Sequence, residues 1–162
     1  MIKKILLPLF AFSLVMACNN EGKEEQDEQE SKNEVAKTPV DSLYEEVMSG
    51  HDEVMPKMGK VRGAQARAKV LLDSISQLPL KAQEAVAGWK KDLESLVSEL
   101  NNADFSMDKW MTEFKMDSAE NDPGLRLKYL AGEKEKVMKV KDAVLGGLAR
   151  ADSLLKAKTA MQ

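Results

Sequence analysis

The chain contains very few of the residues from which disulfide frameworks, metal centres and histidine-dependent active sites are built. Among its 162 residues there is one cysteine, Cys18, and one histidine, His51. A single cysteine gives no disulfide framework, and a single histidine excludes nearly all sites that need several. The sequence also contains no Gly-x-Ser-x-Gly motif and no glycine-rich loop of the kind that binds phosphate. We therefore predict that the protein is not an enzyme.

The charge and hydropathy patterns exclude two further classes of protein. The chain has 24 basic and 27 acidic residues, a net charge of −3, and no basic patch of the kind that nucleic-acid-binding proteins need. Beyond residue 18, no apolar run approaches the roughly 20 residues that cross a bilayer as a helix. We therefore expect no nucleic-acid partner and no transmembrane helix in the body of the protein.

The first 18 residues combine a basic start, a short apolar stretch and the chain's single cysteine. Lys3 and Lys4 provide the positive charge, and the following residues 5–16 are apolar but too few to span a bilayer stably. The segment Leu14-Val15-Met16-Ala17-Cys18 resembles a bacterial lipobox, with an aliphatic residue three positions before the cysteine and a small residue directly before it. The resemblance implies cleavage before Cys18 and a thioether between its thiol and diacylglycerol.

We therefore predict that residues 1–17 are a lipoprotein signal peptide and that Cys18 carries diacylglycerol and an N-acyl chain, with no other cofactor. Each buried methylene adds about 0.8 kcal/mol of membrane affinity, so two or three acyl chains would anchor the protein firmly. Asn19, where an aspartate would favour retention in the inner membrane, indicates the outer membrane of a cell envelope, with the body facing the periplasm or the cell surface. The alternative is an ordinary cleaved secretory signal that leaves the Cys18 thiol free.

Residues 18–40 are predicted to form a disordered, acidic tether. Loss of the signal peptide removes Lys3 and Lys4 and takes the net charge from −3 to −5. Between residues 19 and 40 there are seven acidic residues and three lysines, with too little apolar surface to offset the entropy of ordering. The tether is either a solvated spacer that holds the body away from an anionic leaflet or an export signal. Acidic runs after the lipidated cysteine resemble surface-sorting signals in some Gram-negative lipoproteins.

The remaining residues, 41–162, carry three apolar stripes with helical spacing. Within each stripe the positions alternate three and four residues apart, which places them on one face of a helix. The first stripe comprises Tyr44, Val47, His51, Val54, Met58, Val61, Gln65, Ala68, Leu72 and Ile75. The second comprises Val86, Trp89, Leu93, Leu96, Leu100, Ala103, Met107, Trp110 and Phe114. The third comprises Leu130, Glu133, Val137, Val140, Val144, Leu148, Ala151 and Leu155.

These stripes predict helices over residues 41–76, 80–116 and 123–158. With short connections between them, they predict an all-α fold, an antiparallel up-down-up three-helix bundle with coiled-coil-like heptads. Pro56 lies inside the first stripe and lacks a backbone N–H, so we expect a kink there. Asn101 and Asn102 do not shift the phase of the second stripe, so that helix is expected to continue through them. Asp122 and Pro123 predict the start of the third helix.

Two polar residues interrupt the predicted core. His51 lies on the first stripe and Glu133 on the third, and counting back from the turns places both at the level of Met107. Because an unpaired buried charge is unfavourable, we expect the two to meet in a polar core layer that fixes the register of the helices.

A ligand site is the alternative interpretation of the same region. His51, Met58, Met107 and Met111 offer an imidazole and thioethers, which are soft ligands suited to Cu(I) or to the axial positions of a haem. Methionines more often fill irregular space in a core, and no second histidine supports a metal site. The sequence leaves both interpretations open.

Several short segments of the body resemble a family of helical lipoproteins from Gram-negative bacteria whose members are sometimes labelled "viral A-type inclusion protein". The segments are residues 51–58, Trp110-Met111, Phe114, Tyr129-Leu130 and residues 133–136. The label reflects coiled-coil composition and implies no viral role. The resemblance implies an uncharacterised envelope lipoprotein. We predict a role in interaction or scaffolding at the membrane, through a protein partner or self-association.

Overall fold

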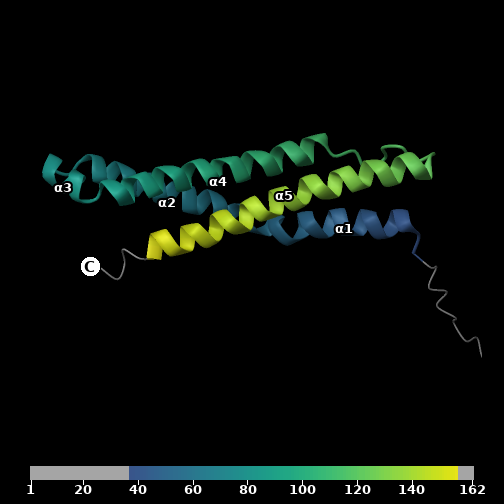
Figure 1. The fold of residues 1–162 in the computed structure, drawn as a ribbon, viewed down its shortest axis with the longest axis horizontal. Helices are drawn as coiled ribbons and strands as arrows, with labels where there is room; N and C mark the ends of the chain where they lie inside the picture. Colours follow the sequence, from purple (N-terminus) through teal and green to yellow (C-terminus); the bar gives the residue numbers. More distant parts are fainter. Residues whose placement is uncertain (1–36, 157–162) are drawn as a thin grey trace, which may run out of the picture. The chain divides into compact units, whose positions relative to one another are not determined.

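In the computed structural model, which describes residues 37–156, every regular element is a helix (Figure 1). The elements are α1 (Pro39–Val54), the 3-10 turn η1 (Met55–Lys57), α2 (Met58–Ser76), α3 (Leu80–Ala85), α4 (Ala87–Glu113) and α5 (Pro123–Lys156). The prediction of an all-helical protein is thereby confirmed for these residues. The predicted signal peptide, the lipidation site Cys18 and most of the predicted tether lie outside them.

The first helix begins two residues earlier than predicted because Thr38 caps it. The Asp41 backbone N–H donates to the Thr38 hydroxyl at 3.1 Å, and the Thr38 backbone N–H donates to the Asp41 carboxylate at 3.0 Å. Pro39 occupies the first turn, where its missing N–H is not needed. The hydrogen bonds from the Thr38 side chain and backbone lower the pKa of the Asp41 carboxyl. The end of the predicted tether therefore belongs to the helical body.

The expected kink at Pro56 is a full interruption of the α-helix. Helix α1 ends at Val54, residues 55–57 form a 3-10 turn, and α2 starts at Met58. Pro56 cannot donate the backbone hydrogen bond that would join the two helices, and its ring crowds the preceding turn. The segment that the sequence predicts as one helix is therefore two helices joined at residue 56.

The second predicted helix, residues 80–116, is also divided. Helix α3 ends at Ala85 and α4 begins at Ala87, because Val86 leaves the helical conformation with φ −112° and ψ 11°. Helix α4 continues through Asn101 and Asn102 as predicted, but it ends at Glu113 rather than residue 116. The third helix begins as predicted, with the Leu125 N–H donating to the Asp122 carboxylate at 2.9 Å.

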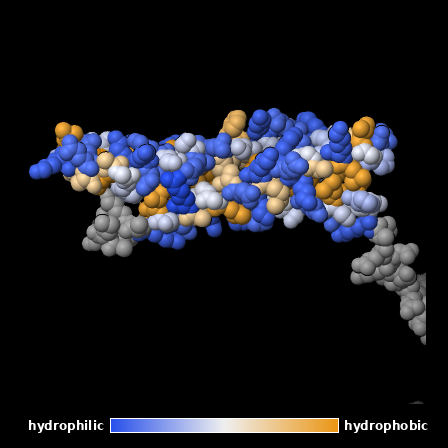
Figure 2. All heavy atoms as spheres, viewed as in Figure 1, coloured by the Kyte–Doolittle hydropathy of each residue, from blue (hydrophilic) through white to orange (hydrophobic). Residues whose placement is uncertain are grey.

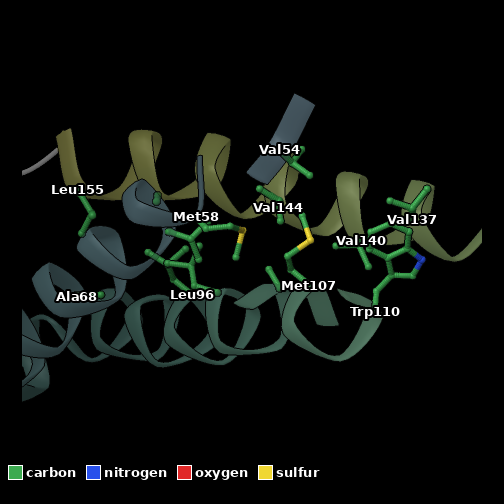
Figure 3. Close-up of a cluster of buried hydrophobic side chains, with 14 of the residues drawn as sticks. Val54, Met58, Ala68, Leu96, Met107, Trp110, Val137, Val140, Val144 and Leu155 are labelled. Carbon is green, nitrogen blue, oxygen red and sulfur yellow. The ribbon is translucent and has the colours of Figure 1, made fainter. Parts of the chain in front are cut away.

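The helices pack side by side around one apolar core. Helix α1 packs along α5, α2 packs mainly on α4, and α4 packs on α5 (Figure 1). Within the described range, no residue of the three predicted stripes is exposed. Figure 3 shows Val54, Met58, Met107 and Val144 from four different helices directed into this core. The face seen in Figure 2 is mostly hydrophilic, and its apolar atoms lie in separate groups, one of them where α1 and α5 begin.

Two glycines allow α5 to approach its neighbours closely. A Cβ atom added at Gly147 would lie 3.0 Å from Cδ2 of Leu100 on α4, and one added at Gly50 would lie 3.0 Å from Cγ1 of Val137 on α5. A Cβ added at the adjacent Gly146 would have no neighbour within 4 Å. A side chain at position 147 would therefore require Leu100 to shift, whereas one at position 146 would not.

The substitution Gly147→Ala should lower the free energy of unfolding by about 1–3 kcal/mol, because the added methyl group overpacks the α4–α5 contact. Gly146→Ala is the matched control and should raise it by about 0.5–1 kcal/mol through helix propensity alone. Urea denaturation followed by circular dichroism measures both. Equal stabilisation by the two substitutions would show that α4 and α5 do not approach closely at Gly147.

Candidate functional site

A row of aromatic rings joins α1, α4 and α5 near the connection between α4 and α5. The His51 ring lies 5.6 Å from the Trp110 ring, Trp110 stacks on Phe114 at 5.0 Å, and Phe114 stacks on Tyr129 at 6.2 Å between ring centroids. The Tyr129 hydroxyl accepts a hydrogen bond from the backbone N–H of Lys115 at 2.7 Å. These contacts fix the end of α4 to the first turns of α5.

A buried arginine lies beside this row. The Arg126 side chain, on a residue only 8% exposed, donates from Nη1 to the carbonyl of Ser118 at 2.7 Å, and its Cζ lies 5.9 Å from the centre of the Tyr44 ring. The sequence analysis missed Arg126 because the third stripe was begun at Leu130. The available signal was its position, four residues before Leu130 and in phase with the stripe.

A carboxylate is buried about two helical turns after Arg126 on α5. Glu133 is 3% exposed, and its Oε1 accepts a hydrogen bond from the Lys136 ammonium at 2.8 Å. Its Oε2 has no hydrogen-bond partner among the described residues. The hydrogen bond to Glu133 raises the pKa of Lys136 above 10.5. The contribution of the Lys136 ammonium to stability is therefore present at neutral pH and is lost as the pH rises past 10.5 through the higher folded-state pKa.

His51 and Glu133 do not form the predicted hydrogen-bonded pair. His51 Nδ1 shares a hydrogen bond with the Asp52 carboxylate at 2.8 Å, and Glu133 is bonded to Lys136. The count from the turns was wrong by about one helical turn, because both connections differ from the prediction: α3 and the break at Val86 precede α4, and α4 ends at Glu113 rather than residue 116. His51 consequently lies beside Trp110 rather than Met107, and its neighbour Gly50 faces Val137 rather than Glu133.

The methionines proposed as soft-metal ligands lie in or against the apolar core. Met58 and Met107 are buried in the same cluster (Figure 3), and Met111 is half-buried and packs against it. Such burial is typical of methionines that fill irregular space, so it does not favour ligation over packing. Within residues 37–156 there is no group of three or more His, Cys, Asp or Glu side chains placed to hold a metal ion. The soft-metal or haem site stays a prediction.

Ion pairs cross the seam between α1 and α5. The Lys134 ammonium pairs with Glu46, and the Lys141 ammonium lies 2.5 Å from the Glu53 carboxylate. The hydrogen bond from Lys141 lowers the pKa of the Glu53 carboxyl. Each lysine of α5 on this seam therefore has an acidic partner on α1.

Fourteen residues further along the chain, α2 takes the place of α1 beside α5, and the charged pairs are absent among the described residues. The positions equivalent to Glu46 and Glu53 are Lys60 and Arg67, and those equivalent to Lys134 and Lys141 are Leu148 and Leu155. Neither Lys60 nor Arg67 forms an ion pair within the described part of the chain.

A groove of about 610 Å³ follows this part of the seam. We call it the α2–α5 groove, lined by Lys60, Ala64, Arg67, Leu148, Ala149 and Leu155. Its α2 edge is basic, and its α5 edge is mainly apolar but includes the Asp152 carboxylate. The arrangement offers a binding surface rather than reactive groups.

The sequence analysis did not identify this groove, although the charge pattern contained a signal. Residues 39–54 include five acidic residues and neither lysine nor arginine, whereas residues 57–72 include five basic residues and no acidic one. The net charge beside the stripe changes from negative in residues 39–54 to positive in residues 57–72. This change indicates that the two segments face different surroundings. What the sequence could not indicate was which side of α2 would remain open.

Comparison of the chain with protein-family models, with curated proteins and with solved structures found no match. Among the helices that the structure describes, none combines the length and apolarity that crossing a membrane requires.

Replacement of Lys136 by methionine should lower the free energy of unfolding by about 1–3 kcal/mol at neutral pH, because it leaves the Glu133 carboxylate buried without a partner. Lys139→Met, on the exposed side of the same helix, is the matched control and should change stability by less than about 0.5 kcal/mol. The double variant Glu133→Leu/Lys136→Met should recover most of the loss. Denaturant titrations measure all three, and a double variant as unstable as Lys136→Met would contradict the assignment.

Proposed function

We propose that this protein is a membrane-anchored envelope lipoprotein with a non-enzymatic role in interaction or scaffolding. The observation that carries the proposal is the segment Leu14–Cys18, in which the chain's single cysteine stands at the position where a lipobox requires it. The basic residues and short apolar stretch before it are those of an export signal. Because no residue after position 18 can supply a second thiol, this cysteine is best explained by lipidation.

We further propose that the helical body is an antiparallel up-down-up three-helix bundle with coiled-coil-like heptads. In this arrangement α1, η1 and α2 together form the first leg, α4 forms the second and α5 the third. The packing of α2 on α4, of α4 on α5 and of α1 on α5 supports this arrangement. The burial of residues spaced three and four apart on each leg supports the heptads.

The proposal divides the mature chain into an anchor, a spacer and an interaction body. Residues 19–36 carry seven acidic side chains and two lysines, and their charge would keep the body away from an anionic leaflet. The Thr38 cap, which starts the helical body at Pro39, supports a boundary near this position. The proposed location is the outer membrane, with the body reaching a protein partner or a second copy of the chain.

The test of the anchor is the substitution Cys18→Ser in the full-length chain, expressed in a Gram-negative host. The wild-type protein should be found in the membrane fraction, and mass spectrometry of its N-terminal peptide should show diacylglycerol and an amide-linked acyl chain on Cys18. Cys18→Ser should leave the membrane fraction or retain its signal peptide, because no thioether can form. Asn20→Ser, which leaves the lipobox intact, is the matched control.

A wild-type protein with a bare Cys18 thiol and no signal peptide would instead indicate ordinary secretion. In that case the anchor would be wrong, whatever the helical body binds.

A further inference from the structure

We infer that the α2–α5 groove is a docking site for an acidic amphipathic helix of a partner protein. The inference rests on the proposed interaction role and specifies the surface and the chemistry of the partner. It does not depend on lipidation of Cys18, because the groove is formed by the helical body alone.

The α1–α5 seam of the same molecule shows what the groove lacks. There, acidic side chains seven residues apart on α1, Glu46 and Glu53, meet lysines seven residues apart on α5. In the groove, Lys60 and Arg67 are also seven residues apart, but the residues across from them are leucines. A bound helix with acidic residues at the same spacing would place one carboxylate near each cation, since seven residues advance a helix by about 10.5 Å.

The opposite edge of the groove provides the apolar part of the site. Leu148 is half-buried and stands on the α5 side of the groove, with the small residue Ala149 beside it. On the α2 side, a Cβ atom added at Gly63 would meet nothing within 4 Å, so the approach to the groove is open. A helix whose apolar stripe covered Leu148 would direct its acidic flank toward α2, as in other helix-in-groove complexes.

The asymmetry of the groove favours a protein helix over an anionic lipid surface. Its cations lie on the α2 edge only, and on the α5 edge the Asp152 carboxylate is paired with Lys156 at 3.1 Å. A flat layer of lipid headgroups would bind best to a convex face with cations throughout. The groove is a hollow whose cations lie on one edge, so it suits a lipid surface less well.

Two occupants from this chain fit less well. Residues 19–36 are acidic, but Val35 and Ala36 are their only aliphatic side chains, so they cannot cover the leucines. In a second copy, Glu46 and Glu53 of α1 already pair with Lys134 and Lys141.

The test measures binding of two synthetic peptides to the purified full-length chain by fluorescence anisotropy. Each peptide has roughly 20 residues with leucines on one face, a length typical of grooved helix complexes, and the flanks carry glutamate in one peptide and lysine in the other. The glutamate peptide should bind about tenfold or more tightly than the lysine peptide, and added salt should reduce the difference. Lys60→Glu/Arg67→Glu should reverse the preference.

The matched control is Lys69→Glu/Lys91→Glu, which changes the net charge equally at exposed positions outside the groove and should leave the preference unchanged. Lys60→Gln/Arg67→Gln should abolish the preference without introducing repulsion between the groove and acidic groups. Leu148→Asp should weaken binding of the glutamate peptide. Circular dichroism of each variant shows that the helices are retained.

Four results would overturn the inference. The first is that neither peptide binds, or that both bind equally well to the wild-type chain. The second is binding to phosphatidylglycerol vesicles, but not to the glutamate peptide, in a manner that depends on Lys60 and Arg67. The third is a wild-type dimer in sedimentation that Lys60→Gln/Arg67→Gln dissociates. The fourth is tighter peptide binding after the acidic residues between 21 and 34 are replaced by glutamine and asparagine, which would identify that segment as the occupant.

Discussion

The missing backbone donor of Pro56 is the constraint on which the rest of this structure depends. The apolar stripe of residues 44–75 continues in phase across it, so both halves must bury the same face. The helix itself cannot continue, and a 3-10 turn separates α1 from α2. The two halves can therefore lean toward different neighbours. Helix α1 follows α5, with Gly50 against Val137, while α2 packs chiefly on α4.

This division accounts for the distribution of charge along the chain. Where α1 follows α5, acids on α1 pair with lysines on α5. Where α2 packs on α4, the Arg62 guanidinium pairs with Asp104 at 2.9 Å, but the cations on its other side face the groove. At the opposite end, the ring row from His51 to Tyr129 joins α1 and the end of α4 to α5. Along α5, the α1 seam thus carries cross-helix ion pairs, whereas the cations of the α2 seam have no acidic partner among the described residues.

Much of the fold follows from the sequence, because period and local signals agree. The three stripes predict which residues avoid solvent, and Asp122-Pro123 predicts the start of α5. The sequence does not predict which side chains of neighbouring helices lie opposite each other, because this depends on the geometry of each connection. Both connections differ from the prediction, since α3 and Val86 precede α4 and α4 ends at Glu113, and the pairing shifts by about one turn. Trp110 rather than Met107 therefore lies beside His51, and Glu133 pairs with Lys136 on its own helix. The groove was not predicted for a related reason. The apolar positions of α2 do not indicate which side of this helix α5 leaves uncovered.

The most direct test of this account is the distance between α2 and α5 with and without the proline. Nitroxide labels at positions 66 and 149, exposed residues on the two helices, report that distance by double electron–electron resonance in a Cys18→Ser background. If Pro56 separates α2 from α5, Pro56→Ala should shorten the mean distance, because a continuous first leg would follow α5 along its whole length. An unchanged distance would show that the groove is set by the packing of α2 on α4 alone and that Pro56 does not control it.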